Sequence, residues 1–180
     1  MKKVLLIIDV QNDYFKHGKM ELHLPEKALI KINKLKDYFI KENLPIIYIQ
    51  HIKEQTNADF FERGTKGLLL HEKLKIDSSS IIVEKQFPNS FLKTNLKETL
   101  ESLGIQQVII TGMMTHMCID STTRACKEYG YETILISDAT ATKSLTFENH
   151  IVNAEKVQYS FLSALTNFAQ IVTTNEYLNL

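Results

Sequence analysis

The sequence predicts an α/β fold in which a parallel β-sheet is covered by helices on both faces. Two patterns carry this prediction. The strand candidates are mostly continuous apolar runs, which is typical of strands buried on both faces. These runs alternate along the chain with amphipathic helical segments, and that alternation produces βαβ units in an open parallel sheet.

Six segments have the composition of buried strands. They are residues 4–10, 46–51, 81–84, 108–111, 133–137 and 171–173. In open α/β sheets, ligands bind beyond the carboxyl ends of the strands, at the point where the strand order reverses. The residues that directly follow each strand are therefore the first candidates for a functional site.

Helical segments connect these strands. Pro25 lies near the first turn of one of them, and Gly104 and Gly130 follow the ends of two others, as is typical of helix starts and stops. The apolar positions recur at helical spacing, so each helix presents one face to the sheet. The expected helices cover residues 28–40, 96–103, 119–129 and 148–168.

The segment from residue 52 to 80 interrupts this alternation. It is long and polar, and it carries the run Gly64-Thr65-Lys66-Gly67. A segment of this length without clear periodicity is often a lid or a binding loop. We see no internal repeat and no break in composition, and therefore expect one domain over residues 1–180.

Composition argues against several classes of partner. Lys plus Arg and Asp plus Glu number 21 each, so no overall field recruits nucleic acid or a membrane. The apolar runs are too short to span a bilayer, and the N-terminus has no evident signal peptide. The two cysteines are eight residues apart on one expected helix, too distant to pair. We therefore expect a cytoplasmic protein with reduced thiols.

Three ionisable residues follow three of the strand candidates. Asp9 ends the first strand, Lys85 follows the third, and Cys118 follows the fourth. In a doubly wound sheet all three face the same edge. A carboxylate, an ammonium group and a thiol supply a base, a charge stabiliser and a nucleophile for acyl transfer.

Cys118 lies where a buried strand passes into a helix. The positive end of a helix favours a thiolate, so the position predicts a reactive thiol of lowered pKa, partly accessible at the sheet edge. Cys126 lies two turns further along and is expected to pack against the sheet. Each residue also has a simpler interpretation: Asp9 satisfying loop N–H groups, Lys85 on a solvated edge and Cys118 as an inert buried thiol.

The motifs resemble those of the isochorismatase-like cysteine hydrolases, a family that includes nicotinamidases and N-carbamoylsarcosine amidases. The resemblance rests on Asp9-x-Gln11-Asn12-Asp13-x-Phe15, on Lys85 at a strand end, and on residues 112–118 (GMMTHMC), and it spans the whole chain. It implies a three-layer α/β/α fold with a six-stranded parallel sheet of order 3-2-1-4-5-6. It also implies a homodimer or a higher homo-oligomer.

The resemblance further implies individual roles. Asp9 matches the general base of the family, Lys85 its catalytic lysine and Cys118 its nucleophile. It implies a cis peptide bond between Met113 and Met114. The backbone N–H groups of Met114 and Cys118 would then form the oxyanion hole.

The sequence departs from the nicotinamidase pattern at the metal site. Nicotinamidases carry an Asp-x-His pair after the second strand and a further histidine downstream, whereas this chain has Ile49-Gln50-His51. A catalytic metal site normally needs three protein ligands. We therefore expect neither a metal nor another cofactor. The isochorismatases themselves generally lack the cysteine, so Cys118 argues against enol-ether hydrolysis.

The sequence thus predicts a metal-independent cysteine hydrolase that cleaves a C–N bond of a small amide, carbamoyl or lactam-like substrate through a thioester on Cys118. Possible pocket residues are Phe15, His51, Phe87 and His116. Two alternatives are a non-catalytic binding or interaction protein on the same fold and a redox-sensing thiol protein. Neither alternative needs a carboxylate and a lysine beside the thiol.

Overall fold

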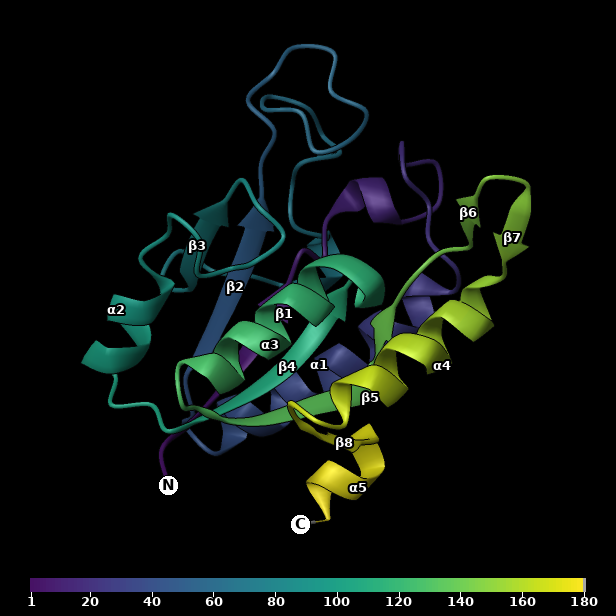
Figure 1. The fold of residues 1–180 in the computed structure, drawn as a ribbon. Coiled ribbons are helices and arrows are strands. Elements are labelled where there is room, and N and C mark those ends of the chain that lie inside the picture. The colour runs from purple at the N-terminus through teal and green to yellow at the C-terminus, as the bar shows by residue number, and fades with distance from the viewer. Residues whose placement is uncertain (180) are drawn as a thin grey trace.

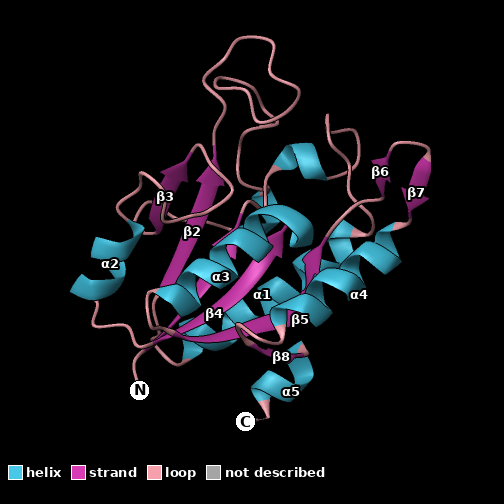
Figure 2. Cartoon of the chain, viewed as in Figure 1, coloured by secondary structure: helices cyan, strands magenta, loops and turns pink. Residues whose placement is uncertain are grey.

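A six-stranded parallel sheet forms the middle layer of the computed structural model, which describes residues 1–179 (Figure 1). The strand order is β3-β2-β1-β4-β5-β8, and helices cover both faces (Figure 2). This confirms the predicted class and order, with β8 as the sixth strand of the sheet. The strands of this sheet are β1 (Lys3–Ile8), β2 (Ile46–His51), β3 (Ile81–Lys85), β4 (Gln107–Met113), β5 (Glu132–Ala141) and β8 (Gln170–Val172).

The central strand β1 explains why the strand candidates are apolar throughout. Leu5 of β1 is in register with Ile46 of β2 and with Ile109 of β4. Leu5 and Ile7 pack into one apolar cluster, while Leu6 and its alternate neighbours pack into the other. Both faces of β1 are therefore buried, and a polar residue on either face would have to be desolvated.

Residues 1–179 contain five helices and three single turns besides the strands. The helices are α1 (Pro25–Lys41), α2 (Leu96–Ser102), α3 (Asp120–Glu128), α4 (Ala154–Leu165) and α5 (Thr174–Leu178). The turns are η1 (Asn12–Tyr14), η2 (Glu72–Leu74) and η3 (Thr115–Ile119).

The helices divide between the two faces of the sheet. Helices α1 and α5 cover one face, where Ile32, Leu35 and Phe39 of α1 are fully buried. Helices α2, α3 and α4 cover the other face, where Leu100 and Cys126 are fully buried. Each such side chain contributes about 1.5–3 kcal/mol when fully buried. The apolar positions that recur at helical spacing in the sequence are therefore the ones that these helices bury against the sheet.

The predicted helix over residues 148–168 is wrong at its start. A short antiparallel hairpin, β6 (Leu145–Phe147) with β7 (His150–Val152), precedes α4. The helix begins only at Ala154, because the Asn153 side chain accepts a hydrogen bond from the Lys156 N–H and caps the first turn. The β-branched and aromatic residues before this cap suit an extended chain better than a helix.

Two strand ends also differ from the predictions. β1 stops at Ile8 rather than at residue 10, because Asp9 adopts a left-handed conformation with φ of 53°. β5 continues beyond residue 137 to Ala141, and its pairing with β4 shifts register between Ile110 and Gly112. Both departures occur at the carboxyl edge, where the candidate residues lie.

In residues 1–179, none of the helices combines the length and the apolar character needed to cross a bilayer.

At Gly112 the backbones of β1 and β4 leave no room for a side chain. Its φ is 121°, and a Cβ atom there would lie 2.0 Å from the carbonyl oxygen of Ile8. We predict that Gly112→Ala lowers the free energy of unfolding by about 2–5 kcal/mol, through backbone strain and overpacking together. Urea denaturation measures the loss.

Gly130 offers a matched control for that variant. Its φ is 85°, but nothing lies within 4 Å of the Cβ position. Gly130→Ala isolates the strain of a positive φ and should cost about 1 kcal/mol. Equal losses in the two variants would show that the close approach to Ile8 is not the cause.

Candidate active site

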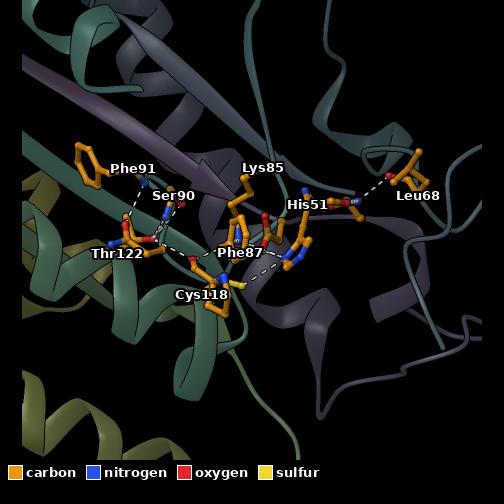
Figure 3. Close-up of polar contacts among 12 residues, drawn as sticks. His51, Leu68, Lys85, Phe87, Ser90, Phe91, Cys118 and Thr122 are labelled. Atoms are coloured by element: carbon orange, nitrogen blue, oxygen red, sulfur yellow. Dashed lines mark hydrogen bonds and ion pairs between the residues drawn. The ribbon is translucent and has the colours of Figure 1, made fainter. Parts of the chain in front are cut away.

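Side chains from three strand ends meet at the carboxyl edge of the sheet (Figure 3). The Asp9 Oδ2 atom lies 2.8 Å from the Lys85 Nζ atom, and both side chains are fully buried. Reactive atoms of Asp9, His51 and Cys118 all lie within 4.8 Å of one another. The three residues proposed from the sequence as base, lysine and nucleophile are therefore in one cluster, and His51 is in it with them.

The backbone positions each member of the cluster. Asp9 leaves β1 in its left-handed conformation, and its N–H donates to the Ile49 carbonyl of β2 at 3.0 Å. Lys85 is the last residue of β3 and is in register with His51, the last residue of β2. Cys118 lies in η3, the turn that joins β4 to α3. Parallel strands end at a common edge, so the topology alone brings these side chains together.

The ammonium group of Lys85 is held by more than Asp9. It donates to the backbone carbonyl of Phe87 at 3.1 Å and to that of Pro88 at 3.2 Å. A buried charge is stable only when its donors are satisfied. The turn after β3 therefore supplies acceptors that keep Lys85 charged inside the protein.

Electrostatics keep Asp9 and Lys85 ionised. Burial opposes the charge of Asp9, but the Lys85 ammonium leads the interactions that outweigh it, and the pKa of Asp9 lies below its ordinary 3.8. Burial likewise opposes the charge of Lys85, yet the Asp9 carboxylate raises the pKa of Lys85 above its ordinary 10.5. At neutral pH the pair is a carboxylate and an ammonium group.

The predicted lowered pKa of Cys118 is wrong. Burial first, and the Asp9 carboxylate second, raise the pKa of the Cys118 thiol, and Lys85 offsets this only in part. The residue is also only 2% exposed rather than partly accessible. The resting site thus holds a protonated thiol beside an ionised carboxylate. Burial alone raises the pKa of Cys126, which lies on α3 and packs against the sheet as predicted.

His51 lies within contact distance of the charged pair and of the thiol, whereas the sequence suggested only a possible pocket residue. Its Nδ1 atom is 3.3 Å from Lys85 Nζ and 3.8 Å from Cys118 Sγ (Figure 3). The same atom is 3.7 Å from Asp9 Oδ2. The sequence contained the relevant signal, because His51 ends a strand whose carboxyl end meets the same edge.

Hydrogen bonds hold the long segment 52–80 next to the cluster. The Gln11 amide donates to the Leu68 carbonyl at 2.7 Å, and Asp13 Oδ2 accepts from the Phe61 N–H at 2.7 Å. Gly67 is required here, since a Cβ atom would lie 2.1 Å from Asp13 Oδ1. The sequence placed Gln11 and Asp13 in the motif, but their hydrogen bonds to segment 52–80 were not predicted from it.

The other possible pocket residues are placed differently. Phe15 is buried with its ring centroid 4.1 Å from that of His71. Phe87 is half-buried and is drawn beside Cys118 in Figure 3. The His116 Nδ1 atom lies 2.6 Å from the Thr142 hydroxyl oxygen, so its ring contacts the strand end of β5 instead of the ion pair.

The segment that leads into η3 carries the expected backbone feature. The peptide bond between Met113 and Met114 is cis, and both residues are buried. Met114 has an extended conformation immediately before η3, and its carbonyl accepts from the N–H groups of Met117 and Ile119. Cys118 lies between those two donors.

The cluster does not fit a metal ion. Asp9, His51 and Cys118 offer a carboxylate, an imidazole and a thiol at close range. However, the Lys85 Nζ atom already lies 2.8 Å from Asp9 Oδ2 and 3.3 Å from His51 Nδ1. Its ammonium charge occupies the place that a cation would need.

The fold and this site define a hydrolase-type α/β protein, and comparison with known proteins identifies the family. The model of the isochorismatase domain matches residues 3–176. The chain therefore belongs to the isochorismatase family of hydrolases.

Individual relatives agree with this assignment. The chain is 41% identical over 179 residues to the isochorismatase family protein YddQ of Bacillus subtilis, covering 99% of each protein. It is 29% identical over 150 residues to Nicotinamidase 3 of Arabidopsis thaliana, covering 77% of this chain and 72% of that protein. The solved structure of an isochorismatase hydrolase-type protein from Oleispira antarctica matches with a TM-score of 0.96 and 36% identity, covering 99% of this chain and 97% of that one.

The buried ion pair predicts a strong coupling between Asp9 and Lys85. Asp9→Asn or Lys85→Met alone leaves one buried charge without its partner, and each should lower the free energy of unfolding by about 3–5 kcal/mol. The double variant removes both charges, and we expect it to be less destabilised than the sum of the two. Urea denaturation of the four proteins gives the coupling energy. Additive losses would contradict a direct pair.

Proposed function

We propose that this protein is a cysteine hydrolase that cleaves a C–N bond of a small amide, carbamoyl or lactam-like substrate without a metal. One observation carries the proposal: an ionised carboxylate, an ammonium group and a protonated thiol are buried together at the functional edge of the sheet. The family supplies the hydrolase class, and Nicotinamidase 3 is an amidase relative by name.

In the acylation step, the Cys118 sulfur attacks the substrate carbonyl carbon while Asp9 takes the thiol proton. The lowered pKa of Asp9 keeps the base ionised and ready at neutral pH. The raised pKa of Cys118 makes a base necessary. Lys85 stabilises the thiolate as its proton leaves.

The tetrahedral oxyanion then needs donors. The backbone N–H groups of Met114 and Cys118, at the start of η3, are the proposed pair. Asp9 returns the proton to the leaving nitrogen, the C–N bond breaks and a thioester remains on Cys118. In deacylation Asp9 takes a proton from water and the oxygen attacks the thioester carbon. The C–S bond breaks to release the acid, and Asp9 returns its proton to the Cys118 sulfur.

The redox-sensor alternative fits the site poorly. Sensor cysteines have low pKa values and are accessible to solvent, whereas Cys118 is buried and its pKa is raised. A pure binding protein has no need of a buried carboxylate and ammonium beside a thiol, because burying both charges is costly. The hydrolase proposal accounts for all three groups.

The substrate is expected to be small. Asp9, Lys85 and Cys118 are each at most 2% exposed. A cavity of about 250 Å³ borders Lys85 and Phe87, but Cys118 is not among its lining residues. Access to the sulfur therefore requires displacement of the side chains that cover it.

A mass-spectrometric screen of small amides tests the proposal. Wild-type protein quenched in acid during turnover should carry an acyl adduct on Cys118, and Cys118→Ala should carry none. Asp9→Asn should lower kcat about 10²–10⁴-fold, because it removes the proton acceptor. Turnover by Cys118→Ala would sink the proposal.

The double variant of Asp9→Asn with Lys85→Met controls for stability. It should recover part of the stability lost by Asp9→Asn and none of the activity. Near-normal turnover by folded Asp9→Asn would remove Asp9 from the mechanism.

Metal removal gives a separate prediction. Because Lys85 occupies the space between Asp9 and His51, exhaustive chelation should leave the rate of hydrolysis unchanged. Elemental analysis before and after chelation checks the metal content. A stoichiometric metal whose removal abolishes turnover would contradict the metal-free mechanism and would make nicotinamidase-like chemistry the leading candidate.

A further inference from the structure

His51 is built into the cluster from both its backbone and its side chain. The Gln11 side chain accepts from the His51 N–H at 2.8 Å and donates to the His51 carbonyl at 2.9 Å. Gln11 itself is fully buried. This two-sided amide contact holds the end of β2 in one place, opposite Lys85 in β3. The His51 side chain is 9% exposed and so has little water to serve as a partner.

The Lys85 ammonium directs its three hydrogens at three partners and forms an ion pair with a fourth. Its nitrogen donates to Phe87 O at 3.1 Å and to Pro88 O at 3.2 Å, and it lies 3.3 Å from His51 Nδ1. Asp9 Oδ2 lies 2.8 Å from the same nitrogen as an ion pair without hydrogen-bond geometry. An ammonium group has three hydrogens, so the one that the two carbonyls leave is directed at His51.

The same contact defines the role of the Nδ1 atom of His51. An ammonium group can only donate, so the Nδ1 atom that faces it accepts. Cys118 Sγ lies 3.8 Å from the same Nδ1 atom, which places His51 beside both the charge stabiliser and the nucleophile.

We propose that His51 is a positioning residue for Lys85 during thiolate formation, an inference that rests on the proposed function. When the thiol proton passes from sulfur to Asp9, the carboxylate becomes neutral and its attraction for the Lys85 charge is lost. The hydrogen bond from Lys85 to His51 Nδ1 then keeps the ammonium group beside the new thiolate. The only proton that moves is the one from Cys118 to Asp9, and His51 serves as an acceptor throughout.

Two substitutions of His51 separate this role from simple packing. Asn places an amide oxygen near the position of Nδ1 and so keeps an acceptor, whereas Leu has similar bulk and none. The readout is the rate at which iodoacetamide alkylates Cys118 at neutral pH, followed by peptide mass spectrometry. It requires no knowledge of the substrate.

His51→Leu should slow the alkylation of Cys118 about ten- to a hundredfold, the range expected for one hydrogen bond to a charged group. Alkylation of His51→Asn should stay within about threefold of wild type. For each variant, kcat on any amide that is turned over should fall by the same factor as its alkylation rate. Thermal melting checks the fold. Wild-type alkylation by folded His51→Leu, or equal slowing in both folded variants, would overturn the proposal.

A measurement on the unmodified protein covers the case in which a variant fails to fold. Nitrogen-15 spectra of histidine-labelled wild-type protein should show an unprotonated Nδ1 on His51. A proton on Nδ1 would overturn the proposal. If alkylation depends on His51 but no amide is hydrolysed, the proposed function fails and the positioning of Lys85 stands. If an amide is hydrolysed through a Cys118 adduct and the rate is unchanged in His51→Leu, the proposed function stands and the positioning role of His51 fails.

Discussion

The ion pair between Asp9 and Lys85 is the interaction on which the rest of this site depends. Its two charged atoms are 2.8 Å apart and neither side chain is exposed. Removing each charge from water costs several kcal/mol, so the pair persists only because its geometry is close and further acceptors complete the lysine shell. The carbonyls of Phe87 and Pro88 provide those acceptors.

The strand order gives this pair its surroundings. β2 lies between β1 and β3, so its last residue, His51, lies beside both the carboxylate of Asp9 and the ammonium group of Lys85. β4 lies on the other side of β1 and delivers Cys118 through η3. A sheet in another order would separate these side chains, although each strand would keep the same sequence.

The charges then set the state of the thiol. A carboxylate beside a buried thiol disfavours the thiolate, and a single ammonium group offsets this only in part. Cys118 therefore rests as a thiol, with the base that can deprotonate it already ionised. In the proposed mechanism, this arrangement couples formation of the nucleophile to the arrival of substrate. The resting thiol also resists oxidation, since the thiolate is the reactive form.

The sequence by itself determined the layers of the fold and the positions of Asp9, Lys85 and Cys118, because continuous apolar runs mark buried parallel strands and those strands end at one edge. Local pattern missed the hairpin before α4, where β-branched residues interrupt a helical spacing. Only the tertiary structure decided the pKa of Cys118 and the place of His51. Burial and distances between charges come from the packing of separate strands, and the spacing of residues along one strand does not contain them.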